Sequence, residues 1–567
     1  MDSSQEKSDM GDKSLTHSVT RGESVRMGSI ANSARNDQLK RHLGNRQIQL
    51  IAIGGSIGTA VFVSISSGLV AGGPGSLFLA YSIYSFMMAL VNNCMAEMAV
   101  LQPVTGGFMR MASKWVDESL GFMAGWNFFL YEVLLIPFEI SALTLVLSYW
   151  RDDIPVAAVI SVCIVLYFCI NVFAVKWYGE AEFWLATGKI LLLAIVFSFT
   201  FVTMVGGNPK HDAYGFRYWK TPGAFAEHIT TGALGRFEGF LAAMWSAAFT
   251  FVGPEYISMV AGEAKLPRRY LKNAFKTAYF RFTLFFVGSA LCVGIVIPYN
   301  DTTLLAILSG SGGAGTAAAS PYVIAMTNLG IGVLPHLTNA LLITSIFSAG
   351  NAYTYCGSRS LYSLALEGQA PKFLLKCTKS GVPIYCLIIT MCFPCLAFLN
   401  VSSGSSEVLS WFVNLLTAAQ IVDYIVICIV YIYFYRACKA QGLDRKTLPY
   451  VGMFQPYSAW IGLAFMTTVV CTYGYSVFLP GKWEVKSFFT YYTMVLVDPI
   501  LYIGWKLWHR TQVVKPLEVD LVWIAPSIDA YEAAFSEEAP GFWTEIVQMF
   551  GFRKKKVTSD SSSGAEF

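Results

Sequence analysis

Charged residues are scarce in this chain. Of its 567 residues only 13% are Asp, Glu, Lys or Arg, whereas 55% are hydrophobic, and the mean hydropathy is +0.51. A soluble globular protein carries about twice this share of charge, so the composition excludes a soluble domain of this length and favours a membrane protein. The net charge of +4 is small and no soluble basic domain is present, which excludes a nucleic-acid-binding protein.

The chain also lacks the residue clusters that metal sites and enzymes need. The six histidines are scattered, and the twelve cysteines lie mostly inside apolar runs, so we expect neither a disulfide framework nor a zinc site. The stretch Thr187-Gly188-Lys189-Ile190 fails the ATP-binding pattern, and Ile53 stands where a dinucleotide-binding fingerprint needs its first glycine. The sequence therefore predicts no enzyme, no catalytic residues, no metal and no cofactor.

The two ends of the chain differ in composition from its middle. Residues 1–46 are rich in Ser, Asn and charge of both signs, and they lack the apolar core of a signal peptide. We expect them to form a disordered cytosolic N-terminal tail. Residues 47–510 form the predicted transmembrane domain, and residues 511–567 form a predicted cytosolic C-terminal tail.

Long apolar runs divide the middle of the chain into about twelve predicted membrane-spanning helices. In chain order they are 48–72, 77–100, 120–150, 154–175, 183–205, 237–261, 274–297, 334–361, 383–399, 408–433, 460–479 and 488–508. The sequence thus predicts an all-α fold that crosses the membrane many times. The loops after the sixth, eighth and tenth spans are rich in Lys and Arg, whereas residues 298–336 contain neither. Because basic loops face the cytosol, both termini are predicted to be cytosolic.

The first predicted span contains the stretch IAIGGSIGTAVF, in which Gly54, Gly55 and Gly58 crowd the middle of the membrane. Each glycine inside a helix costs about 1 kcal/mol relative to alanine. Three of them beside Ser56 and Thr59 indicate a helix that opens to show its backbone to a polar ligand. The alternative is that Gly54 and Gly58 form a G-x-x-x-G face for helix packing.

The sixth predicted span contains a second interruption. Gly253-Pro254 removes a backbone donor in the membrane, and Glu255 places a carboxyl group where charge is expensive and usually functional. Two broken helices five spans apart are typical of inverted repeats, in which the broken helices meet at the bilayer midplane and bind substrate. The pair of interruptions favours a binding site over helix packing.

Blocks of sequence between residues 40 and 510 resemble those of one transporter family. They read RQIQLIAIGGSIGTAVFVSISSGLVAGGPGSL, EMAVLQPVTGGFMRMASKWVDESLGFMAGWNFF, YGEAEFW, GFRYWKTPGAF, SAAFTFVGPE, AGEAKLPRRYLKNAFK and NAYTYCGSRSLYSLALEGQAPKF. In these blocks the chain is similar to the fungal amino acid permeases of the amino acid–polyamine–organocation superfamily. The resemblance implies a LeuT-like fold of five plus five inverted helices and the import of amino acids with protons across the plasma membrane.

The broken helices offer charge of both signs to an amino acid. Free N–H groups at the start of the second half-helix suit the substrate carboxylate, and free carbonyls at the ends of the first half-helices suit the ammonium group. The rings of Phe249 and Phe251 are expected to cap the site from outside, although lipid-facing or core positions remain the alternative for either ring. The residues expected to contact substrate are Gly55, Ser56, Ile57, Gly58, Thr59, Phe249, Thr250, Phe251 and Asn351.

Three ionisable residues are candidates for proton coupling. Lys189 is a lone cation in the fifth span, and the resemblance places it where sodium-coupled relatives hold an ion. Its alternative role is a lysine that extends to the cytosolic interface. Glu139 matches a family glutamate and Glu255 lies at the second break. Glu132 lies seven residues before Glu139, on nearly the same helix face, and would favour a cationic substrate or extend a proton path.

Specificity is only partly readable from the sequence. The apolar and aromatic sixth span favours neutral amino acids, while Glu132 keeps basic amino acids or related amines open. A second functional class is an amino acid sensor with the transporter fold, but such sensors usually carry a long cytosolic extension, which the short N-terminal tail does not provide. Lys7, Lys13 and Lys40 in that tail are expected to accept ubiquitin through ligase adaptors, as the resemblance suggests.

Overall fold

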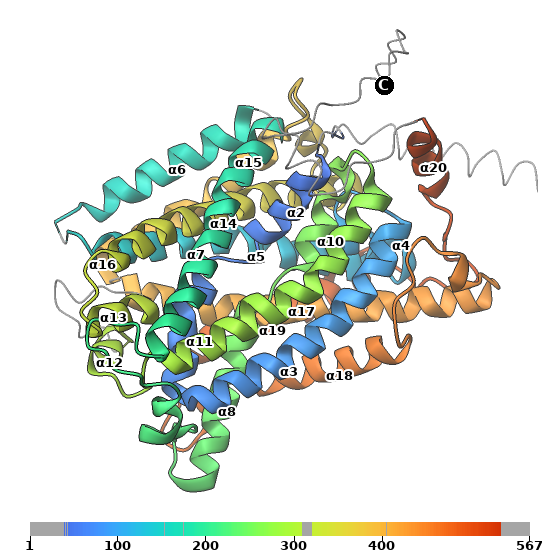
Figure 1. Ribbon diagram of the computed structural model, residues 1–567. Helices are drawn as coiled ribbons and strands as arrows, with labels where there is room; N and C mark the ends of the chain where they lie inside the picture. The colour runs from blue at the N-terminus through green and yellow to red at the C-terminus, as the bar shows by residue number, and fades with distance from the viewer. Residues whose placement is uncertain are drawn as a thin grey trace, which may run out of the picture.

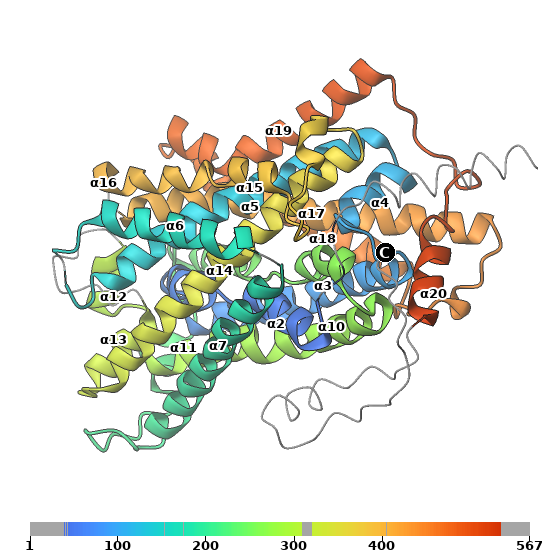
Figure 2. The same ribbon diagram turned by 90° about the horizontal axis from the view of Figure 1, so that it is seen from above.

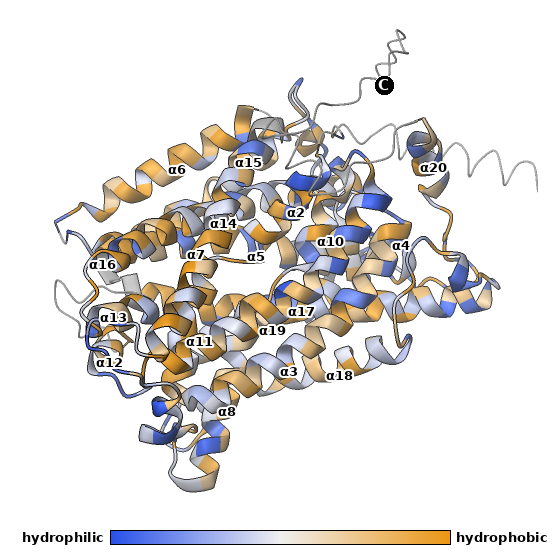
Figure 3. Ribbon diagram, viewed as in Figure 1, coloured by the Kyte–Doolittle hydropathy of each residue, from blue (hydrophilic) through white to orange (hydrophobic). Residues whose placement is uncertain are grey.

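The computed structural model describes residues 39, 41, 43–151, 153–173, 175–308, 320–403 and 405–534. Within these ranges the chain forms helices and loops, and β structure is limited there to two isolated bridges. Many of the long helices lie side by side along a common direction (Figures 1 and 2). Hydrophobic residues follow these helices, whereas hydrophilic residues gather mainly at their ends (Figure 3). The expected all-α membrane architecture is confirmed.

Helices cover every predicted span. The first five spans correspond to α2 (Asn45–Gly54) with η1 (Ala60–Ser64), α3 (Ile65–Leu101), α5 (Glu118–Leu147), α6 (Val156–Phe173) and α7 (Val175–Met204). The next five correspond to α8 (Gly232–Thr250) with α9 (Pro254–Met259), α10 (Pro267–Arg281) with η4 (Phe282–Val287) and α11 (Gly288–Val296), α14 (Leu334–Leu366), α15 (Ile384–Thr390) with η6 (Phe393–Leu399), and α17 (Ser405–Ala440). The last two are α18 (Tyr457–Thr472) and α19 (Val485–His509). Six helical stretches in the described residues are long and apolar enough to cross a membrane.

A kink joins the first and second spans where the sequence predicts a loop. The helix α3 continues through Gly73, which has a φ of 77°, a backbone conformation that a side chain would strain. The loop at 224–226 satisfies the backbone groups freed by this turn. Its Ala226 N–H donates to the carbonyl of Gly72 over 2.9 Å, and its Ala224 carbonyl accepts from Gly75 N–H over 2.7 Å.

The two halves of the transmembrane domain follow the same order of elements. In each half a broken span comes first, and short helices follow the second span: α4 (Gly107–Trp115) after α3, and α12 (Thr302–Leu308) and α13 (Pro321–Asn328) after α11. This repeated order of elements is the one expected of an inverted-repeat transporter fold.

Part of the predicted C-terminal tail packs against the end of the bundle that carries α4. Trp523 is buried against Trp115, with ring centroids 6.4 Å apart. The side chains of Gln102 and Trp115 donate to the carbonyls of Leu521 and Asp520 over 2.8 and 3.1 Å. The helix α20 (Ala525–Ala533) follows and is visible beside α10 in Figure 1. We refer to residues 511–534 as the C-terminal segment.

The predicted ubiquitin acceptors Lys7, Lys13 and Lys40 lie outside the described residues, as does most of the 1–46 tail. The few described residues of that tail contact the end of the sixth span. Leu43 N–H donates to the carbonyl of Glu263 over 2.9 Å, and Arg41 Nη1 donates to the carbonyls of Ala261 and Ala264 over 3.3 Å. The start of the first span is thereby attached to the end of the sixth.

Candidate functional site

The first span opens between Gly54 and Thr59. The helix α2 ends at Gly54, and residues 55–58 form turns before helical structure resumes at Thr59. Lys189 Nζ on α7 donates to the carbonyl oxygen of Gly54. The hydroxyl of Tyr353 on α14 donates to the carbonyl oxygen of Gly55 over 3.2 Å. Two carbonyls at the break are thus satisfied by side chains, as membrane depth requires.

Close approach of two carboxyl groups explains the glycines of this break. A Cβ atom on Gly54 would lie 1.9 Å from Oε1 of Glu182, and one on Gly58 would lie 2.6 Å from Oε1 of Glu139. Both separations are below 3.0 Å, and real Cβ atoms essentially never come so close to another heavy atom. Because these nearest neighbours are carboxyl groups and not the backbone of an adjacent helix, the geometry favours a site over a packing face.

Lys189 is buried inside the bundle, where the charges of two acidic side chains act on it. Its side chain is 0% exposed, so it does not extend to the membrane interface. The charges of Glu182 and Glu139 both act on its ammonium group. Taking a cation out of water is costly unless it is paired, and here the two carboxyl groups and the Gly54 carbonyl supply the compensation.

Glu182 is a site residue that the sequence reasoning missed. Its Oε1 accepts from Ser348 Oγ over 2.5 Å, and its Oε2 accepts from Asn351 Nδ2 over 3.4 Å. A signal was present, because Glu182 precedes Lys189 by seven residues and therefore shares its helix face. The predicted residue Asn351 lies at this carboxyl group, and its Oδ1 accepts from Asn171 Nδ2 over 2.9 Å.

The carboxyl group of Glu139, which belongs to α5, lies at the start of the second half of the first span. Its Oε2 accepts from Thr59 Oγ1 over 2.5 Å and its Oε1 accepts from Thr59 N–H over 3.4 Å. This is the position that the sequence assigns to the substrate carboxylate. The N–H groups of Gly55 and Ile57 were also expected to be free for that carboxylate, but they donate to the carbonyls of Ile51 and Ile53. Ser56 Oγ donates back to the carbonyl of Ala52 over 2.8 Å.

The second break is held by α17. The carbonyl of Phe251 accepts from Gln420 Nε2 over 2.8 Å and from the Tyr424 hydroxyl over 2.9 Å. Glu255 accepts from the same Tyr424 hydroxyl over 2.9 Å and from Gly253 N–H over 3.2 Å. The sequence identified Glu255 as a site residue but neither Gln420 nor Tyr424. A single polar residue in an apolar span does not reveal which backbone group of another span it contacts.

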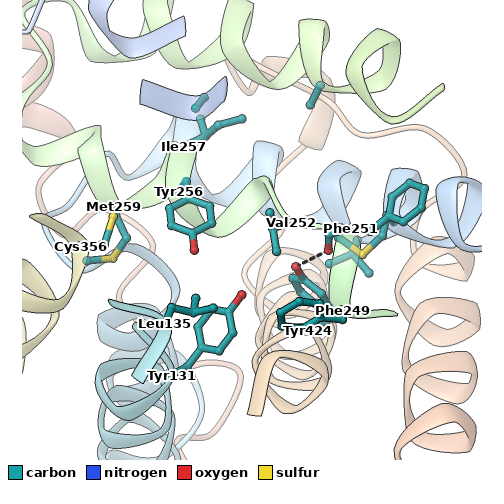
Figure 4. Packing of buried hydrophobic residues seen from close by; sticks show 14 of the residues in the cluster. Tyr131, Leu135, Phe249, Phe251, Val252, Tyr256, Ile257, Met259, Cys356 and Tyr424 are labelled. Carbon is teal, nitrogen blue, oxygen red and sulfur yellow. Dashed lines mark hydrogen bonds between the residues drawn. The ribbon is translucent and has the colours of Figure 1, made fainter. Parts of the chain in front are cut away.

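Aromatic side chains surround the unwound part of the sixth span. In Figure 4 the hydroxyls of Tyr131 and Tyr256 point toward the space between the two rings. Phe249 packs edge-on against Phe138, with centroids 5.3 Å apart. The predicted residues Phe249, Thr250 and Phe251 are all buried. The region next to the second break is therefore largely apolar.

Two further charged residues lie near the two breaks. Glu132 is 0% exposed and neither carboxyl oxygen has a hydrogen-bond partner. Arg359, which follows Ser348 and Asn351 on α14, forms a buried ion pair with Glu263 at 3.0 Å. That pair joins α14 to the end of the sixth span.

Within the described residues no group of three or more His, Cys, Asp or Glu side chains could hold a metal ion. Cys392 and Cys395 have a C-x-x-C spacing, but both are exposed on the ninth span and no second pair accompanies them. Glu139, Glu182 and Glu255 accept from hydroxyl, amide and backbone donors.

The sequence comparisons all match this chain to amino acid permeases. The family model described as amino acid permease matches residues 47–518. The general amino acid permease AGP2 of Saccharomyces cerevisiae is 44% identical over 93% of this chain and 89% of its own length. The dicarboxylic amino acid permease of the same organism is 39% identical over 86% and 80%, and a proline-specific permease of Emericella nidulans is 38% identical over 90% and 92%. Among solved structures, the manganese transporter of Eremococcus coleocola aligns with 87% of this chain and 98% of its own, with a TM-score of 0.49 and 10% identity.

The glycine at position 58 gives a first test. We expect Gly58→Leu to abolish amino acid uptake while the protein still reaches the cell surface, because the new side chain would occupy the space of Glu139 and Ala349 at the break. Radiolabelled uptake at matched surface level measures the effect. Gly504→Leu is the control, since no atom lies within 4 Å of its Cβ position. Normal uptake by Gly58→Leu would refute the broken-helix site.

Proposed function

The chain belongs to the amino acid permease family, a family of transporters, and from this premise we propose that it imports amino acids together with protons. The transport is secondary and active, with alternating access around the two broken helices. The proposed location is the plasma membrane, where the bilayer surrounds about twelve spans and both termini face the cytosol. The observation that carries the proton coupling is the contact of Lys189 with the first break.

Lys189 has the properties that a proton carrier needs. Among the described residues it is the one fully buried lysine, and its ammonium group binds directly to Gly54, the last residue of α2. A neutral amine would no longer neutralise the two carboxyl groups and would bind the carbonyl less strongly. Loss of the proton would therefore weaken the attachment of α2 to α7 and favour its movement.

Glu139 links the substrate to the proton. Its carboxyl group already accepts from Thr59 at the start of the second half-helix, where a substrate carboxylate would also bind. Two carboxylates at one site repel each other, so the entry of substrate favours a protonated or displaced Glu139. Glu255 is the corresponding candidate at the second break.

The driving force is sufficient for accumulation. A gradient of about 2 pH units supplies roughly 2.7 kcal/mol per proton, and a potential of about 100 mV adds roughly 2.3 kcal/mol. Together, about 5 kcal/mol sustains a concentration ratio of several thousandfold. A facilitator without coupling would reach no such ratio.

Replacement of Lys189 tests this coupling. We expect Lys189→Ala to retain substrate binding but to lose concentrative, pH-dependent uptake, because the variant has no charge to release at the break. Uptake is measured against external pH with and without a protonophore, at matched surface level. Lys372→Ala is the control, since Lys372 is exposed. Accumulation by Lys189→Ala with the wild-type pH profile would place the proton path at Glu139 or Glu255 instead.

For the substrate we propose neutral amino acids. The aromatic and apolar residues around the second break suit an uncharged side chain, and Glu132, buried with both oxygens unpaired, disfavours an acidic one. The names of the relatives cover general, dicarboxylic and proline permeases, so the family leaves specificity open. Basic amino acids or related amines are the alternative, since Glu132 would attract a cation.

Competition assays decide the substrate class. In a permease-deficient yeast that expresses this chain, we expect neutral amino acids to compete most strongly for uptake of a labelled neutral amino acid. Strong competition by lysine or arginine that Glu132→Gln removes would support the alternative. Competition by aspartate and glutamate alone would contradict both assignments.

Ubiquitin ligase adaptors are the proposed cytosolic partners. Lys7, Lys13 and Lys40 lie in the polar N-terminal tail, where an adaptor would reach them. We expect their joint replacement by arginine to lengthen the lifetime of the permease at the cell surface, because arginine keeps the charge but accepts no ubiquitin. The lifetime is followed after synthesis is stopped, and an unchanged value would argue against this role.

A further inference from the structure

A cavity of about 490 Å³ lies between α2, α7 and α10, apart from the substrate site. Its polar lining consists of Asn45, Gln49, Asn273, Lys276, Thr277 and Arg281. Two of these six residues are cations, and no Asp or Glu lines the cavity. Gln49 Oε1 accepts from Thr277 Oγ1 over 2.8 Å, which leaves the amide group of Gln49 as a donor. The lining therefore suits an anion.

Arg281 is the central feature of this cavity. Its side chain is only 6% exposed, and its Nε and Nη1 atoms are buried without a hydrogen-bond partner. Its Nη2 donates to the carbonyl of Ala274 over 3.4 Å. Glu255 acts on the guanidinium group electrostatically, but the oxygens of Glu255 accept from Tyr424 and Gly253. A buried guanidinium group with two unused donors is costly unless an anion completes it.

The cavity opens toward the lipid on the cytosolic half of the membrane. Phe280 in α10 and Leu284 in η4 lie on either side of Arg281 in the chain and also line the cavity, and they are 77% and 56% exposed. Lys276 precedes Arg281 by five residues, about 7.5 Å along the helix, and the basic start of α10 faces the cytosol. Arg281 thus lies slightly deeper than the lipid headgroups, where a phosphate group can reach it while acyl chains follow the exposed apolar side chains.

We propose that this cavity binds a phosphate group, supplied by an anionic phospholipid of the cytosolic leaflet or by free phosphate. Arg281 provides a forked pair of N–H donors that matches phosphate oxygens, and Lys276 adds charge at the mouth. Basic pockets between membrane helices on the cytosolic side bind lipid headgroups in this way.

Occupation of the cavity has a consequence for the first span. Asn45 and Gln49 belong to α2, the inner half of the broken helix, whereas Arg281 belongs to α10. A phosphate group between them connects the two helices. The bound anion therefore stabilises α2 in its place against α10 and acts on the alternating-access equilibrium from outside the substrate site.

The test measures binding without transport, so its result is independent of the proposed proton symport. The full-length permease is reconstituted into nanodiscs of phosphatidylcholine, of phosphatidylcholine with phosphatidylinositol, and of phosphatidylcholine with added inorganic phosphate. The unfolding midpoint and the lipid retained in native mass spectrometry are recorded. The variants are Arg281→Gln and Lys276→Glu, with Arg269→Gln as the control, because Arg269 is exposed on the same helix and does not line the cavity.

We expect the anionic lipid to raise the midpoint of wild type and Arg269→Gln by about 2 °C or more. Loss of one charge-assisted contact in Arg281→Gln should weaken retention about tenfold. Lys276→Glu, at an exposed position that folding does not depend on, should weaken it as well. An equal, Arg281-dependent shift by inorganic phosphate in phosphatidylcholine would identify free phosphate as the source. Equal anion binding by wild type, Arg281→Gln and Lys276→Glu would overturn the proposal, as would no binding by wild type.

Discussion

The constraint on which this structure depends is that a backbone group without a helical partner must find another partner inside the membrane. Both breaks meet it with side chains from other spans. Lys189 and Tyr353 donate to the carbonyls of the first break, and Gln420 and Tyr424 donate to the carbonyl of Phe251 in the second. These donors lie on α7, α14 and α17, so each of the three helices must pack where its side chain reaches an open carbonyl.

The same constraint explains why charge concentrates at the first break. Glu139 and Glu182 approach Gly58 and Gly54 so closely that only glycine fits, and the charges of both acids act on Lys189. A protein interior tolerates such charges only as a compensated group. A change in the protonation or position of one member therefore alters the contacts of the others, and through the Gly54 carbonyl it reaches α2.

The sequence predicted the features that single residues or short runs encode. Glycines in an apolar span and a Gly-Pro pair before Glu255 reveal helices that cannot continue, and Lys189 is conspicuous because lysine is expensive in a membrane. What the sequence did not reveal depends on tertiary contact. Glu182 becomes part of the site only because α7 packs against α2. Gly73 replaces a predicted loop by a kink because the distant loop at 224–226 is available to bind its backbone.

The C-terminal segment has a consequence for how the protein is made. Gln102, Trp115 and Gln441 each donate to carbonyls of residues 516–522, so their buried or partly buried donors find these partners only after residues 516–522 have been translated. The segment follows all of the long helices in the chain, so the ends of α3, α4 and α17 receive these bonds only after the helices themselves have been synthesised. Insertion of the spans and closure of this end of the bundle are thus separate steps in the biogenesis of the protein.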